Sequence, residues 1–96
     1  MRNVYIVSYD ISDPKRLRDV YRAMKGFGES YQYSVFYCKL SQKEKILLMG
    51  KLNELINHDA DRVLIINLGT NGGDLERRIE CLCVFPNVSK DKALIV

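Results

Sequence analysis

The sequence predicts a single α+β domain in which two helices cover one face of an antiparallel sheet. Its 96 residues are enough for one hydrophobic core, and 47% of them are hydrophobic. Apolar, β-branched and aromatic runs alternate along the chain with two amphipathic segments of helical period. This order predicts a ferredoxin-like βαββαβ sandwich that occupies residues 1–96 as one domain and carries an extra C-terminal strand.

The first two elements are a strand and a helix. Residues 2–9 form an apolar run that is typical of a buried strand. Asp13 is a plausible N-cap, and Pro14 suits the first helical position, where a missing N–H costs nothing. We expect Gly26 and Gly28 to end the helix. Its core stripe has the i, i+3, i+4, i+7 spacing and consists of Leu17, Val20, Tyr21 and Met24.

The next segment, residues 31–40, is rich in Tyr, Val and Phe and predicts a strand. It can also be two strands joined by a tight or bulged connection, as the ferredoxin-like order requires. Large side chains alternate onto both of its faces, so we expect it to be covered on both sides or to lie at an interface.

The second helix begins with a capping box that runs from Ser41 to Glu44. Its expected buried stripe comprises Leu48, Met49, Leu52, Leu55 and Ile56. A polar loop over residues 57–61 precedes a continuous apolar strand at 63–68 and a glycine-rich turn at 69–73. We expect a further strand at 79–85, which is followed by a turn.

The chain closes on four apolar residues, 93–96. Chain ends are commonly polar and frayed, so an apolar end needs cover. We hypothesise that the segment 86–96 contacts a partner protomer and adds a strand to its sheet. Packing on the chain's own sheet is an equally good interpretation of the same pattern. A domain this small covers only about 60–65% of its unfolded surface, which is compatible with a homodimer.

Composition narrows the class of protein. The net charge is +3, and residues 1–52 carry ten Lys and Arg against five Asp and Glu. This basic half suggests a polyanionic partner. The three cysteines, at 38, 81 and 83, form no CxxC pair and are expected to be buried packing residues. No apolar run approaches the about 20 residues of a membrane helix, and no signal peptide is evident, so we expect a cytoplasmic protein without a membrane partner.

Asp10 is the foremost candidate for chemistry. It follows the buried first strand and lies beside a helix N-terminus, where a carboxylate can hold a divalent cation such as Mg²⁺. In a symmetric dimer, an aspartate near the axis would meet its own copy and could share a metal with it. Such a metal can activate water against a phosphodiester. Alternatively, Asp10 accepts hydrogen bonds from nearby backbone N–H groups and only supports the fold.

A basic stripe on the first helix is the second candidate. Lys15, Arg18, Arg22 and Lys25 share the side that faces away from the core stripe. Several cations along one face are what phosphate contacts require, although a solvated helix face has the same pattern. Arg16 lies off this stripe, nearer to the Asp10 end of the helix.

Taken together, these residues resemble the CRISPR-associated protein 2 family over nearly the whole chain. The resemblance rests on Tyr9-Asp10-Ile11, on the basic run 15–18, on the block from Gly28 to Phe36, which contains Gln-x-Ser-Val-Phe, on Asp61-Arg62-Val63 and on Leu94-Ile95. It implies that Tyr9, Asp10 and Phe36 are functional or supporting positions and that Arg16 and Arg18 bind nucleic acid. Many members carry an arginine where this chain has Ser30.

The resemblance also implies an activity and partners. It predicts a ferredoxin-like homodimer in which Asp10 of each protomer binds Mg²⁺ across the axis, and a metal-dependent endonuclease that acts on single-stranded RNA or duplex DNA. It further implies a role in spacer acquisition for antiviral defence, together with the CRISPR integrase. The alternative is a non-catalytic, dimeric DNA-binding scaffold for that integrase.

Overall fold

The computed structural model describes residues 1–70, which contain four strands and two helices. Their order is β-α-β-β-α-β, as predicted. The elements are β1 (Asn3–Asp10), α1 (Pro14–Lys25), β2 (Gly28–Gln32), β3 (Val35–Leu40), α2 (Gln42–Leu55) and β4 (Arg62–Asn67).

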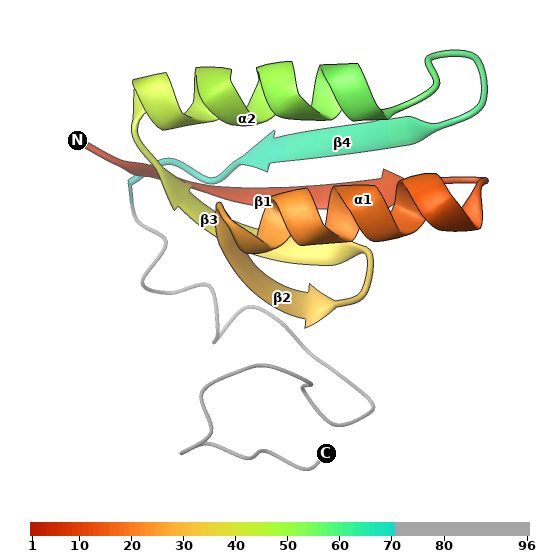
Figure 1. The fold of residues 1–96 in the computed structure, drawn as a ribbon. Helices are drawn as coiled ribbons and strands as arrows, with labels where there is room; N and C mark the ends of the chain where they lie inside the picture. Colours follow the sequence, from red (N-terminus) through yellow and green to blue (C-terminus); the bar gives the residue numbers. More distant parts are fainter. Residues whose placement is uncertain (71–96) are drawn as a thin grey trace, which may run out of the picture.

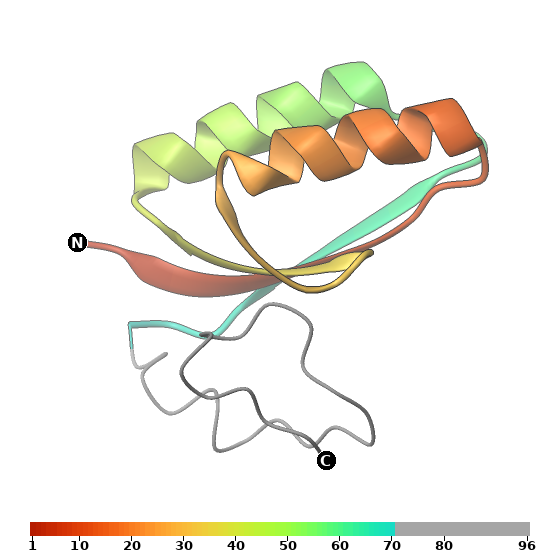
Figure 2. The same cartoon turned by 60° about the horizontal axis from the view of Figure 1, so that its bottom comes forward.

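The four strands form one sheet with the order β2-β3-β1-β4, and each neighbouring pair is antiparallel. Both helices lie on the same face of this sheet, so the structure has two layers (Figures 1 and 2). This arrangement confirms the ferredoxin-like sandwich. Neither helix in residues 1–70 is long and apolar enough to cross a membrane.

The core lies between the sheet and the helices. Alternate residues of β1, namely Tyr5, Val7 and Tyr9, point to the helices and are buried. Phe36 and Cys38 of β3 join them and have no exposed surface. Leu40 at the end of β3 is also a core member. The remaining members come from the helices and the β1–α1 connection: Ile11, Val20, Met24, Leu48 and Leu52. The buried Cys38 is the packing residue that the sequence predicts.

The β1–α1–β2 unit follows the prediction with shifted boundaries. Asp10 is the last residue of β1 rather than the residue that follows it. The Asp13 carboxylate caps α1 by accepting a hydrogen bond of 2.9 Å from the Arg16 N–H. Gly26 caps the other end, but Gly28 already belongs to β2. A Cβ at Gly28 would clash with the Tyr37 carbonyl and the Cys38 sulfur, so close strand packing explains this glycine.

The segment 31–40 divides into two strands, which was one of the two interpretations. Tyr33 and Ser34 form the turn between β2 and β3. The β2 strand begins at Gly28, earlier than predicted, and its pairing with β3 shifts register between Ser30 and Gln32. The early start of β2 and the two-residue turn let a short segment supply both strands.

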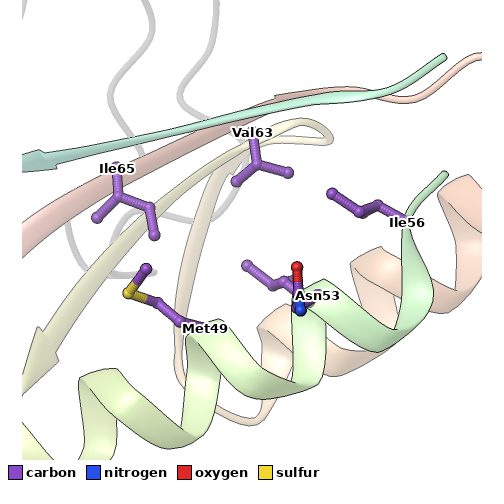
Figure 3. A pocket seen from close by; sticks show the side chains of 6 residues that line it. Met49, Asn53, Ile56, Val63 and Ile65 are labelled. Atoms are coloured by element: carbon purple, nitrogen blue, oxygen red, sulfur yellow. The ribbon is translucent and has the colours of Figure 1, made fainter. Parts of the chain in front are cut away.

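The second helix carries the predicted capping box, in which Ser41 and Glu44 exchange hydrogen bonds. Leu48 and Leu52 are buried as expected, but the prediction for Met49 is wrong, since 47% of this residue is exposed. Met49 lies at the margin of the buried stripe, over the strand β4. Its side chain points toward Ile65 and lines a groove of ≈ 150 Å³ between α2 and β4 (Figure 3).

The strand β4 begins one residue earlier than predicted, at Arg62, and ends at Asn67. Leu64 and Ile66 are 53% and 49% exposed, so this strand is covered less evenly than its continuous apolar run suggests. The expected strand at 79–85, the segment 86–96 and most of the turn at 69–73 lie outside the described residues.

Candidate active site

Asp10 lies on the face of the sheet that points away from the helices. Its neighbour Tyr9 points into the core, and alternation along β1 turns Asp10 to the opposite side, where it is exposed. Across the β1–β4 ladder, Asp10 stands directly opposite Arg62. These two residues and Leu64 take part in lining a hollow of ≈ 180 Å³ at this end of the sheet.

The Asp10 carboxylate has no hydrogen bond or ion pair with any residue of 1–70. Arg62 likewise has no ion pair within that range. The alternative in which backbone N–H groups bind Asp10 is therefore not seen in this part of the chain. An exposed carboxylate that no residue of 1–70 engages is a candidate for ligand binding.

A second aspartate, Asp61, accepts backbone hydrogen bonds and supports the fold, which is the alternative role that was considered for Asp10. Its side chain has no exposed surface, and it accepts hydrogen bonds from both the N–H and the hydroxyl of Ser12, at 3.1 and 3.2 Å. The Asn57 N–H donates at 2.8 Å, and two nitrogens of the Arg16 guanidinium donate at 2.8 and 3.2 Å. These donors hold the pKa of Asp61 well below its usual range, and the Arg16 bond has the largest effect.

The Asp61 contacts join three parts of the chain at the Asp10 end of the sheet. They fasten the β1–α1 turn and the first turn of α1 to the loop before β4. Sequence reasoning treated Asp61 as part of a polar loop and, by resemblance, as the start of a strand. No spacing rule could have found its partners, because Arg16 and Asp61 lie 45 positions apart.

Arg16 was predicted to bind nucleic acid, and the structure places it in this ion pair. Its hydrogen bond to Asp61 raises the pKa of the Arg16 guanidinium. The same side chain also donates to the Ser12 hydroxyl at 3.3 Å. Arg16 thus helps to hold the β1–α1 turn to the loop before β4, whether or not it also contacts a ligand.

Lys15, Arg18, Arg22 and Lys25 are all exposed on α1, as predicted. Lys15 pairs with Asp19 at 3.1 Å, and the Lys25 ammonium lies 5.6 Å from the centre of the Tyr21 ring. Arg18 and Arg22 form no ion pair with residues 1–70. Because α1 belongs to the helix layer, this basic stripe and Asp10 are on opposite faces of the sheet (Figure 2).

Tyr9 and Phe36, which the resemblance singled out, both belong to the core. The Tyr9 hydroxyl donates a hydrogen bond to the Tyr33 carbonyl, and burial raises the pKa of this phenol. The Phe36 ring lies 6.3 Å from the Tyr9 ring and 5.5 Å from the Tyr21 ring, centre to centre. This cluster holds the β2–β3 turn beside the end of β1 that carries Asp10.

Ser30 is buried on the helix side of β2, opposite Phe36. Its hydroxyl donates a hydrogen bond of 2.8 Å to the Gln32 carbonyl, within the bulged part of the strand. A hollow of ≈ 250 Å³ adjoins it and is lined in part by Tyr21 and Lys25. Ser30 is therefore satisfied locally and lies on the other face of the sheet from Asp10.

The fit of a magnesium ion can be judged from these side chains. No group of three or more His, Cys, Asp or Glu side chains that could hold a metal occurs in residues 1–70. Mg²⁺ typically uses one or two carboxylates, keeps several waters and relies on substrate phosphates. Asp10 provides one exposed carboxylate of the required type, so the arrangement fits such an ion when a phosphate or a second carboxylate completes it.

Comparison with known proteins identifies relatives of this chain. The family described as CRISPR associated protein Cas2 matches residues 3–73. A CRISPR-associated endoribonuclease Cas2 from Rhodospirillum rubrum is 41% identical over 94 residues, which are 98% of this chain and 91% of the relative. Another from Geobacter sulfurreducens is 45% identical over 72% of this chain and 73% of its own length.

Solved structures agree with these matches. The crystal structure of Streptococcus pyogenes Cas2 superposes with a TM-score of 0.73 and is 31% identical, covering 82% of this chain and 98% of that one. The crystal structure of a hypothetical protein from Thermus thermophilus has a TM-score of 0.69 and 29% identity, covering 71% of this chain and 83% of that one. The fold and the family thus rest on independent comparisons.

Proposed function

This chain belongs to the CRISPR-associated Cas2 family, and on that premise we propose that it is a metal-dependent endonuclease with Asp10 as the catalytic metal ligand. The relatives' printed names, CRISPR-associated endoribonuclease, favour RNA as the substrate class. The observation that carries the proposal is the Asp10 carboxylate, which is exposed in a hollow and unengaged by residues 1–70.

The proposed chemistry needs only a few groups of this chain. Asp10 would hold Mg²⁺, which supplies positive charge to the phosphate and activates a water molecule for attack. Tyr9 and Phe36 would keep the Asp10 end of β1 in place through the core. The Arg16–Asp61 pair would hold the turn that follows Asp10.

We further propose that the working unit is a homodimer. The sheet face that carries Asp10 also exposes Leu64 and Ile66, and a second copy packed there would cover apolar surface. A two-fold axis near Asp10 would bring two carboxylates to one metal. The segment 86–96 would contact the partner protomer. Sedimentation of the full chain should give the mass of a dimer.

The test of the nuclease compares the wild type with Asp10→Asn on labelled single-stranded RNA and on duplex DNA, each with Mg²⁺ or a chelator. We expect Mg²⁺-dependent cleavage of RNA that Asp10→Asn abolishes without a change in mass by sedimentation. Asp59→Asn removes the same charge from an exposed loop residue and should cleave like the wild type. Equal cleavage by Asp10→Asn and the wild type would contradict the role of Asp10.

A second function is favoured by the basic stripe, which lies away from Asp10. We propose as an alternative that α1 binds duplex DNA and that the dimer is a non-catalytic scaffold for the CRISPR integrase in spacer acquisition. Arg18 and Arg22 are exposed and form no ion pair in residues 1–70. Residues that bind phosphate need this kind of accessible positive charge. Charge reversal at both should abolish DNA binding, whereas Asp10→Asn should leave it intact.

A cytoplasmic location stays a prediction.

A further inference from the structure

Arg62 is the cation placed directly beside Asp10, and sequence analysis assigned it no chemistry. The two residues face each other across the antiparallel β1–β4 ladder and therefore lie on the same face of the sheet. Side chains in such a pair start from Cβ atoms about 4.5–5.5 Å apart. Both are exposed, and both line the same hollow of ≈ 180 Å³.

The Asp10 carboxylate and the Arg62 guanidinium face each other without a salt bridge. Neither side chain forms an ion pair with any residue of 1–70. One negative and one positive group, side by side and open to solvent, match a phosphodiester that carries a divalent cation. The cation would face Asp10, and the phosphate oxygens would face Arg62.

The backbone that carries Arg62 is fixed by its neighbour in sequence. Asp61 is fully enclosed and bonded to Ser12, Arg16 and Asn57. Ser12 is two residues beyond Asp10, so the same carboxylate ties together the two chain segments on which Asp10 and Arg62 lie. Contacts outside the hollow therefore help to hold the backbone positions of Asp10 and Arg62 relative to each other.

We infer that Arg62 binds a non-bridging oxygen of the phosphodiester that is held at Asp10, an inference that rests on the proposed nuclease function. In hydrolysis, the water oxygen forms a bond to phosphorus and gives up a proton, the bond from phosphorus to the leaving oxygen breaks, and the leaving oxygen takes up a proton. Negative charge builds up on the non-bridging oxygens during this exchange. A guanidinium that binds one of them stabilises that charge.

The experiment measures kcat and KM for RNA cleavage by the wild type, Arg62→Gln and Arg62→Lys in Mg²⁺. We expect Arg62→Gln to lower kcat by roughly 10²-fold, which is the usual cost of one such donor. Arg62→Lys should recover part of the loss, because it keeps the charge but not the two-pronged geometry. Lys51→Gln removes the same charge from an exposed position on α2 and should match the wild type. Thermal melts of all four proteins separate a folding defect from a lost contact.

RNA binding gives a second measurement that does not depend on cleavage. We would follow fluorescence anisotropy of a labelled single-stranded RNA at several salt concentrations, with a chelator in place of Mg²⁺ so that the RNA is not cleaved. One lost phosphate contact should make the slope of log K against log salt shallower by about 0.7 in Arg62→Gln. Lys51→Gln should keep the slope of the wild type.

The outcomes separate the two proposals. If the wild type cleaves and Asp10→Asn does not, but Arg62→Gln has normal kcat and an unchanged salt slope, the nuclease stands and the role of Arg62 is refuted. If the wild type does not cleave, the nuclease proposal fails, and the salt slope alone decides whether Arg62 binds phosphate. An unchanged slope in that case overturns the inference as well.

Discussion

The two faces of the sheet differ in how far residues 1–70 engage their side chains. On the helix-covered face, Tyr9 and Phe36 are buried and Tyr9 is hydrogen-bonded, so both side chains pack in the core and stabilise the fold. On the opposite face, Asp10, Arg62 and Leu64 are exposed, and neither charge is paired within residues 1–70. Residues that are adjacent in sequence, such as Tyr9 and Asp10, therefore divide between the buried core and the exposed face.

The two aspartates give the sharpest form of this comparison. Asp61 has no exposed side-chain surface and accepts hydrogen bonds from three residues. Asp10 is exposed and bonded to none of residues 1–70. Since they are the same residue type at the same end of the sheet, only their partners distinguish them. Of the two, Asp10 is the carboxylate that residues 1–70 leave without a partner.

The largest difference should appear between Phe36 and Leu64. Phe36→Ala removes a fully buried ring, and we expect it to lower the free energy of unfolding by about 3–5 kcal/mol. Leu64→Ala, on the exposed face, should cost less than about 1 kcal/mol when the protein is monomeric. Urea denaturation at one low protein concentration measures both. Equal losses would show that the two faces do not differ in this way.

A large effect is also expected from Asp61. Asp61→Asn puts an amide where the Arg16 guanidinium and two backbone N–H groups need an acceptor. We expect the Tm to fall on the order of 10 °C. Asp10→Asn should leave the Tm almost unchanged, because no contact of residues 1–70 is lost. Thermal melts by circular dichroism test the pair, and a larger fall for Asp10→Asn would reverse our assignment of the two aspartates.

The same pair predicts a pH dependence of stability. The pKa of Asp61 is lowered in the folded state, so below the ordinary aspartate value of about 3.9 the unfolded chain binds more protons than the folded one. The stabilisation is complete above that value and is lost progressively as the pH falls below it. Melts of the wild type and Asp61→Asn toward acidic pH should converge. A gap between their Tm values that stays constant with pH would exclude this linkage.

Much of the fold was predictable because local rules govern it. The Asp13 cap, the Ser41–Glu44 capping box and the stripe of α1 all depend on residues within one or two turns of each other. Alternation along β1 likewise accounts for Tyr9 and Asp10 lying on opposite faces. Met49 was placed wrongly, because helical period gives the direction of a side chain but not how completely the neighbouring strand covers it.

The site was predictable only in part, for the same reason. Asp10 stands out from the end of an apolar run, which is a local signal. The pairing of Asp10 with Arg62, and that of Arg16 with Asp61, arise from strand pairing and loop packing between distant segments. Without the register of β1 and β4, nothing in the sequence shows which charge faces Asp10. Sequence reasoning therefore found the carboxylate and missed the cation beside it.

The smallest predicted effect concerns Tyr9, which lies next to Asp10 but faces the core. Tyr9→Phe keeps the packing against Phe36 and removes only the hydrogen bond to the Tyr33 carbonyl. We expect a loss of about 1 kcal/mol in the free energy of unfolding, measured by urea denaturation. Because the hydroxyl lies on the other side of the sheet from Asp10, kcat for RNA cleavage should stay near that of the wild type when Tyr9→Phe is assayed well below its Tm. A fall in kcat at full folding would mean that the Tyr9 hydroxyl acts in the site itself, and that the sheet does not separate the two tasks at this position.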